Sequence, residues 1–183
     1  MDRIISYTKT AKFLHWLMAL IWILVWTMGM LAVYGRQTFN PEHSLTAFHK
    51  AIASTILLLV VIRIIWRLTH TPPALPANMS NHGQYITKLG HIAIYLFALI
   101  AMPLSGWLLC SFASSPITVA GLFNLPPLTA PHPEYIDLIW QIHCYLAWFC
   151  GLLILGHILL AFKHHFIDKD TVLISMLPHH KKL

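Results

Sequence analysis

Four histidines within or at the ends of long uncharged stretches offer this chain's most distinctive chemistry. His143 and His157 are 14 residues apart in one stretch, and His15 and His49 belong to two others. Ionisable side chains inside a membrane segment are costly and usually serve a function. Fourteen residues of α-helix rise about 21 Å and return to within roughly 40° of the same face. One helix would therefore present two imidazoles on one side, one near each surface of a bilayer.

The composition indicates a membrane protein. Of the 183 residues, 57% are hydrophobic and only 10% are charged, whereas soluble domains carry about 25% charged residues. Four stretches are apolar and almost free of charge, and a membrane span needs about 20 such residues. We therefore predict a single integral-membrane domain over residues 1–183, an all-α transmembrane four-helix bundle. The expected spans are residues 13–34, 49–67, 87–110 and 137–162.

The first span begins like a secretory signal, because Arg3, Lys9 and Lys12 precede it. Its apolar run of 22 residues is longer than the apolar region of a signal peptide, which has about 7–15 residues. We therefore interpret this segment as a retained membrane anchor.

Lysine and arginine are distributed unevenly between the two sides of the predicted bundle. Ten of the twelve lie on the side of the N-terminus, and only Arg36 and Lys50 lie on the other. Cytoplasmic loops carry the excess of Lys and Arg, so we expect both termini in the cytoplasm. This bias accounts for the net charge of +6 without a nucleic-acid partner. The ten residues are Arg3, Lys9, Lys12, Arg63, Arg67, Lys88, Lys163, Lys169, Lys181 and Lys182.

Prolines mark the third span and the loop that follows it. Pro103 lies inside the span and should kink the helix, because proline lacks an N–H and its ring clashes with the preceding turn. The loop from Ser111 to Tyr135 contains five prolines together with hydrophobic residues. We expect this loop on the outer side, packed across the mouth of the bundle.

Depth sorts the four histidines into two pairs. His15 lies in the first turn of the first span and His157 near the end of the fourth, both on the inner side, whereas His49 and His143 open their spans from the outer side. A lone histidine in a membrane span is most often a hydrogen-bonded interhelical residue. Matched pairs favour axial ligands of haem iron. Zinc would need four ligands at one centre, whereas these pairs lie about 21 Å apart.

His91 is the fifth histidine of the spans and enters the third one from the inner side. It could replace His15 as a ligand, or it could lie beside the inner cofactor and bond a propionate or a substrate. We favour the second interpretation. The three cysteines form no C-x-x-C-H motif, so covalent haem attachment is excluded.

The order and spacing of several short motifs resemble the bacterial cytochrome b561 family, over nearly the whole chain. Each motif is weak alone, but their joint order is specific. The motifs are His15-Trp16, Arg63-x-x-x-Arg67-Leu68, Thr71-Pro72-Pro73, Gly90-His91-x-x-x-Tyr95, and His143 followed by His157 and His164-His165.

The resemblance implies a small di-haem cytochrome of the bacterial inner membrane with two non-covalent b-type haems inside its bundle. It assigns His15 and His157 to the inner haem and His49 and His143 to the outer haem, the same pairs that depth alone indicates. The chain is similar to the family member that oxidises superoxide and reduces ubiquinone, which implies a superoxide:quinone oxidoreductase.

Substrate residues can be suggested on physical grounds. Superoxide is an anion, and Arg36 and Lys50 are the cations expected on the outer side, where they could attract it. Alternatively, they pair with haem propionates or with Glu42. On the inner side His164 and His91 could serve quinone binding or proton delivery, since imidazole titrates near neutral pH.

Other interpretations stay open. His164 and His165 together could simply anchor the inner interface. The whole chain could be a cytochrome b relay subunit that links the quinone pool to a partner dehydrogenase or another periplasmic redox protein, using the same four histidines. A haem-free transporter or scaffold is a third class.

Overall fold

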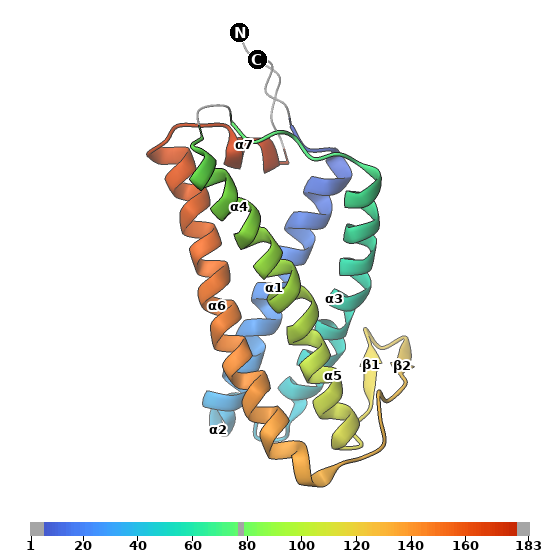
Figure 1. Cartoon of the computed structure of the whole chain (residues 1–183). Coiled ribbons are helices and arrows are strands. Elements are labelled where there is room, and N and C mark those ends of the chain that lie inside the picture. Colours follow the sequence, from blue (N-terminus) through green and yellow to red (C-terminus); the bar gives the residue numbers. More distant parts are fainter. Residues whose placement is uncertain (1–5, 77–78, 179–183) are drawn as a thin grey trace.

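The computed structural model describes residues 6–76 and 79–178. Four of its helical segments are long and apolar enough to cross a membrane, and they run alternately up and down as one bundle (Figure 1). The predicted all-α transmembrane four-helix bundle is confirmed. The four segments are Lys9–Tyr34, Ser44–Thr69, Asn81–Phe112 and Pro133–Phe166.

The first, second and fourth segments contain helices α1 (Lys9–Tyr34), α3 (Ser44–Thr69) and α6 (Ile136–Phe166). The third segment is continuous but composite. It consists of α4 (Asn81–Ala93), the π-helical segment η1 (Ile94–Ala101) and α5 (Met102–Phe112). The short elements are α2 (Arg36–Phe39), the strands β1 (Ile117–Val119) and β2 (Phe123–Leu125), the 3-10 turn η2 (Pro133–Tyr135) and α7 (Val172–Met176).

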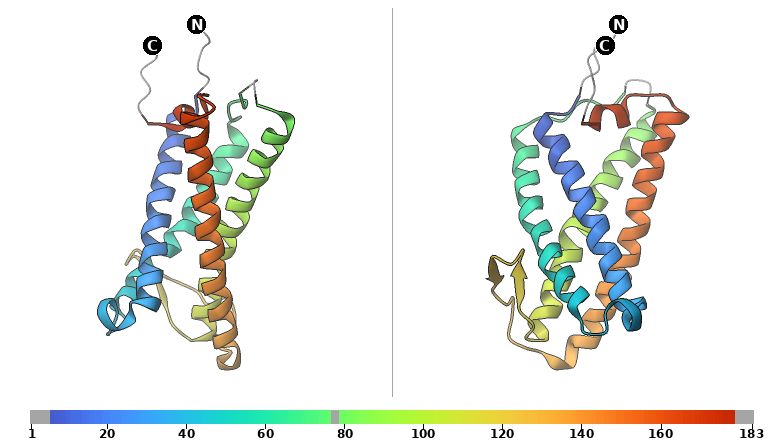
Figure 2. Two further views of the ribbon diagram at one scale, coloured as in Figure 1. Left: turned by 90° about the vertical axis from the view of Figure 1, so that its left-hand side faces the viewer. Right: turned by 180° about the vertical axis from the view of Figure 1, so that it is seen from behind.

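The two ends of the bundle differ. We call one the basic end; there α7 lies across the start of α1 (Figure 2). The Lys12 ammonium donates to the Leu177 carbonyl at 2.8 Å, and the Trp16 indole donates to the Met176 carbonyl at 2.9 Å. The described cations of this end are Lys9, Lys12, Arg63, Arg67, Lys88, Lys163 and Lys169. Arg3, Lys181 and Lys182, which enter the charge argument above, lie outside the described residues.

The other end, which we call the hairpin end, carries α2 and the two strands. β1 and β2 pair antiparallel with Val119 opposite Phe123, and their hairpin packs beside α3 (Figures 1 and 2). From the sequence we expected only a loop across the mouth of the bundle here. The strands form because β-branched residues at Ile117, Thr118 and Val119 suit a half-buried strand, and Gly121 takes the left-handed conformation of the turn (φ 78°).

The core of the bundle joins all four long segments. Its centre is filled by α1 side chains, and Trp22 and Val25 are almost completely buried there. Trp26 packs into the space left by Gly151, where a Cβ would lie 2.9 Å from the indole ring. The buried cluster is Met18, Trp22, Val25, Ile56, Val60, Ala98, Leu99 and Cys150.

Pro103 changes the third segment in a way that involves this core. The π-helical turns of η1 come directly before Pro103, and the Met102 N–H bonds to Phe97, five residues back. The Ala98 carbonyl is therefore left without a donor from its own helix. The N–H four residues later, that of Met102, is bonded to Phe97, and Pro103, five residues later, has no N–H. The buried Trp22 indole donates to this carbonyl at 3.1 Å. The disruption expected at Pro103 is thus a local change of helix type, compensated from α1.

We predict that Trp22→Phe destabilises the protein more than the loss of packing requires. The substitution leaves the buried Ala98 carbonyl without a partner, which costs about 1–3 kcal/mol. Thermal unfolding in detergent micelles would measure this, with the exposed Trp140→Phe as control. Pro103→Ala restores an N–H to the segment, so in that background the cost of Trp22→Phe should shrink. An equal cost in both backgrounds would contradict this explanation.

Candidate functional site

Two pairs of histidines converge inside the bundle, one toward each end. His49 of α3 and His143 of α6 have ring centres 6.4 Å apart with ring planes at 89°. His15 of α1 and His157 of α6 have ring centres 6.3 Å apart with planes at 61°. The structure therefore brings together the same four residues that the sequence analysis paired.

These separations fit an iron porphyrin between the rings of each pair. Metal–imidazole nitrogen bonds are roughly 2 Å long, and that nitrogen lies about 1.1 Å from its ring centre, so two imidazoles on opposite sides of one metal ion have centres about 6 Å apart. Both pairs meet this condition. The donor set is also suitable, because histidine imidazole is a common ligand of haem iron.

At the hairpin end, hydrogen bonds hold both rings in the tautomer that a metal ligand needs. His49 Nδ1 donates to the Val25 carbonyl at 2.8 Å. His143 Nδ1 bonds to Ser105 Oγ at 2.8 Å, and this hydroxyl itself donates to Met102. Ser105 Oγ must then accept from His143. With the proton on Nδ1 in both rings, both Nε2 atoms keep the lone pair that binds metal.

Glycine makes room for these two rings. A Cβ at Gly29 of α1 would lie 3.1 Å from His49 Cε1, and one at Gly106 of α5 would lie 3.1 Å from His143 Cε1. Both contacts are closer than side chains ordinarily tolerate, so the neighbouring helices approach the ligand rings only because these positions have no side chain. Neither Gly29 nor Ser105 was expected from the sequence to contact a ligand ring.

The basic end offers two candidates to partner His157. By distance His15 fits better, because the ring of His91 is only 5.4 Å from that of His157. By hydrogen bonding His91 fits better, because its Nδ1 donates to the Thr87 carbonyl at 2.7 Å and leaves Nε2 free. His15 Nδ1 faces the Arg63 guanidinium at 3.3 Å, which can only donate, so the proton of His15 lies on Nε2.

Arg63 has unused hydrogen-bonding capacity beside this pair. Its Nε donates to the Tyr95 hydroxyl at 2.7 Å, but its Nη1 is buried and has no partner among the described residues. A buried guanidinium nitrogen without an acceptor is unfavourable. A cavity of about 310 Å³ adjoins it, with Arg67 and Tyr7 also in its lining. A carboxylate in this cavity, such as a haem propionate, would supply the missing acceptor.

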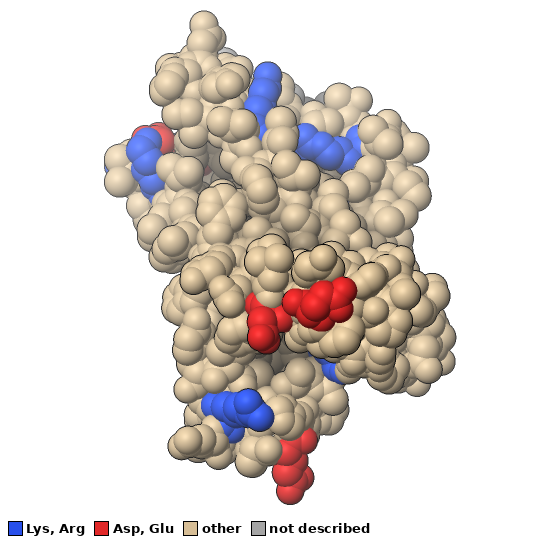
Figure 3. Space-filling view, turned by 60° about the horizontal axis from the view of Figure 1, so that its bottom comes forward, with Lys and Arg blue, Asp and Glu red and all other residues tan. Residues whose placement is uncertain are grey.

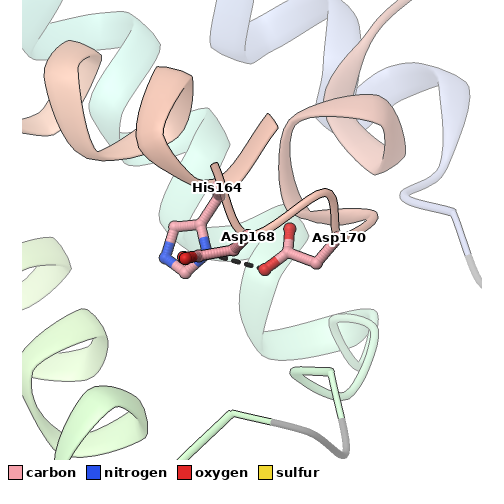
Figure 4. A group of neighbouring side chains, drawn as sticks. All are labelled: His164, Asp168 and Asp170. Atoms are coloured by element: carbon pink, nitrogen blue, oxygen red, sulfur yellow. Dashed lines mark hydrogen bonds and ion pairs between the residues drawn. The ribbon is translucent and has the colours of Figure 1, made fainter. Parts of the chain in front are cut away.

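His164, in the last turn of α6, forms a compact cluster with Asp168 and Asp170, which follow the helix (Figure 4). His164 Nδ1 bonds to Asp170 Oδ2 at 2.6 Å and lies 3.2 Å from Asp168 Oδ2. The ligand atoms lie close enough together for a metal ion, but the Lys163 ammonium already bonds both oxygens of Asp168. We therefore interpret the cluster as a hydrogen-bonded network that orients His164. The two aspartates were not expected from the sequence, because they follow the helix in an irregular segment.

The two cations of the hairpin end bond to uncharged groups. The Lys50 ammonium donates to Ser115 Oγ at 2.8 Å and to the Pro116 carbonyl at 3.3 Å. Arg36 bonds to His43 Nε2 at 3.1 Å. Figure 3 shows this end with few charged side chains scattered over a largely uncharged surface.

Comparison with known proteins agrees with the geometry of the bundle. Residues 6–179 match the family model described as prokaryotic cytochrome b561. The chain is 34% identical over 163 residues to cytochrome b561 homolog 2 of Escherichia coli (strain K12), covering 89% of this chain and 86% of that protein. It is 26% identical over 175 residues to cytochrome b561 homolog 1 of the same organism, covering 96% and 98%.

A further relative is named for an activity. The chain is 28% identical over 165 residues to the probable superoxide oxidase CybB of Yersinia pestis, covering 90% of this chain and 92% of that protein. The family resemblance inferred from the histidine motifs is thereby confirmed. Membership of this family implies that the protein binds b-type haem and transfers electrons in a membrane. The chain belongs to the prokaryotic cytochrome b561 family and is a multi-pass membrane protein of electron transfer.

Proposed function

We propose that this chain is a di-haem superoxide:ubiquinone oxidoreductase of the bacterial inner membrane, with both termini in the cytoplasm. Two superoxide ions give two electrons at the hairpin end and leave as dioxygen, and ubiquinone takes these electrons with two protons at the basic end. The observation that carries the proposal is the two histidine pairs at two levels of one bundle, whose ring centres lie 6.3 and 6.4 Å apart, as two imidazoles bound to one iron would.

In this proposal His49 and His143 hold one haem and His15 and His157 hold the other. When bound, b-type haem supplies a reversible one-electron couple whose potential depends on its axial ligands. Val25 and Ser105 keep the outer ligand rings in the metal-binding tautomer. Arg63 would neutralise a haem propionate through its Nη1, and His15 would bind iron through Nε2 once its proton has moved to Nδ1 and its ring has turned away from the Arg63 Nη2. His91 then lies beside this site rather than in it.

The hairpin end attracts the anionic substrate. Lys50 follows the ligand His49 directly in the sequence, and Ser115 and Pro116 hold its ammonium in place. Arg36 adds a second positive charge at this end. Fixed cations around a small target raise the encounter rate of an anion. The name of the Yersinia pestis relative supports superoxide as the donor.

At the basic end His164 is suited to deliver protons. It lies seven residues after His157 on α6, so it projects from nearly the same helix face about 10 Å further along. Asp170, whose side chain is only 7% exposed, holds the proton of His164 on Nδ1. The Nε2 atom is then free to exchange a proton with a quinone oxygen, and each quinol formed requires two such deliveries.

A relay subunit that serves a partner redox protein is the second candidate. The exposed side chains of Leu122 and Phe123 on the hairpin are the observation that favours it, because a docking surface needs apolar area. The two functions differ in whether the purified chain acts alone.

The purified holoprotein alone is predicted to consume superoxide in proportion to added ubiquinone. Lys50→Gln and Arg36→Gln should each lower the second-order rate constant with superoxide by up to about tenfold and weaken its dependence on ionic strength, because steering is electrostatic. Lys88→Gln, at the basic end, is the matched control. Consumption that requires a second protein would favour the relay subunit instead.

Asp170→Asn should slow quinone reduction by roughly tenfold or more, as expected when a general acid–base group is misoriented. The haem spectrum and the rate of haem reduction by superoxide should stay unchanged. Stopped-flow spectroscopy separates these two steps. Asp168→Asn is the control, because Asp168 is more exposed and already paired with Lys163. Equal slowing by both substitutions would refute a specific role for Asp170.

A further inference from the structure

The β1–β2 hairpin has an apolar tip that no other described part of the chain covers. Leu122 is 80% exposed and Phe123 is 49% exposed. The opposite side of the hairpin is anchored, because Ile117 and Val119 are buried where β1 packs against α3. The tip therefore faces away from the bundle, on the outer flank of a membrane-spanning helix (Figure 1).

The depth of the tip follows from one hydrogen bond. The Ala120 N–H donates to the Ala51 carbonyl at 3.1 Å, and Ala51 is seven residues inside α3, counted from Ser44. Seven residues correspond to about 10 Å along the axis, and all 26 residues of α3 to about 39 Å. A hydrocarbon core of about 30 Å centred on this helix would begin roughly 5 Å from its end. The tip then lies several ångströms inside that boundary.

The chemistry of the segment suits this depth. From Phe112 to Pro133 the chain contains no Lys, Arg, Asp or Glu. Two hydrogen bonds satisfy some of the polar groups around the tip: Thr118 Oγ1 donates to Asn124 Oδ1 at 2.6 Å, and the Leu122 N–H donates to the Val119 carbonyl at 2.8 Å. Because unsatisfied polar groups are costly in hydrocarbon, these bonds suit a turn placed near the edge of the acyl-chain region.

We propose that the β1–β2 hairpin is a lipid-binding element whose tip, Ala120 to Phe123, inserts among the acyl chains of the leaflet at the hairpin end. The inserted tip would restrict the motion of the segment that binds Lys50. Ser115 and Pro116, which accept hydrogen bonds from the Lys50 ammonium, directly precede β1. The open edge of β2 limits the depth, since unpaired strand edges are unfavourable deep in hydrocarbon.

Depth-dependent fluorescence quenching tests the proposal. The holoprotein, with Cys110, Cys144 and Cys150 replaced by serine, receives Leu122→Cys, is labelled with an environment-sensitive dye and is reconstituted in liposomes. Lipids with a nitroxide near the glycerol end of the acyl chain should quench the dye strongly, lipids with a nitroxide at the chain terminus weakly, and aqueous iodide hardly at all. Ala130→Cys, on the exposed loop at the hairpin end, is the control and should be quenched by iodide.

Two results would overturn the proposal. Quenching by iodide as strong as at position 130 would place the tip in water. Protection from both iodide and nitroxide lipids would mean that protein covers it, either a second copy or a partner. If the cysteine-free chain loses its haem absorbance, a photoreactive phenylalanine analogue at position 122 of the native chain replaces the dye. Lipid adducts found by mass spectrometry would then support insertion, and protein adducts or none would refute it.

Discussion

The structure depends on holding two pairs of imidazole rings with their centres 6.3 and 6.4 Å apart within a bundle of four membrane-spanning segments. α6 supplies one ring to each pair, because His143 and His157 lie on nearly the same face of an uninterrupted helix. The facing rings come from α3 and α1, whose positions are set by packing rather than by sequence spacing. The neighbouring helices must approach these rings without filling the space between them, which is why Gly29 and Gly106 lie directly against the pair at the hairpin end.

The same constraint explains the unusual third segment. It must bring Ser105 to His143 while passing the buried indole of Trp22. The π-helical turns before Pro103 change the phase of the helix between these two contacts. The carbonyl that loses its helix donor is satisfied by Trp22, so the change of helix type costs little hydrogen bonding and joins α1 to the segment. The two ends of the bundle carry different groups. The basic end carries most of the cations and the His164 network, and the hairpin end carries Lys50 and the β1–β2 hairpin.

Hydropathy and histidine spacing were sufficient to predict the bundle and the family, because both follow from local and periodic properties of the chain. The same information paired His49 with His143 and His15 with His157, which the structure places at matching separations. Tertiary contacts were not predictable: Ser105, Val25 and Asp170 reach their histidines from other elements or from an irregular turn. The hairpin was missed because its strands of three residues are too short to show a period. The competition between His15 and His91 could not be decided from depth, since both enter from the same side.

The central claim is that the chain holds two haems, each between two histidines, and that His15 rather than His91 completes the second site. Haem per chain, measured by pyridine haemochrome absorbance alongside low-spin signals in electron paramagnetic resonance, tests it most directly. The account predicts two haems in the unaltered chain and in His91→Ala, and one haem in His15→Ala. A single haem in the unaltered chain, or loss of a haem in His91→Ala with both retained in His15→Ala, would contradict it.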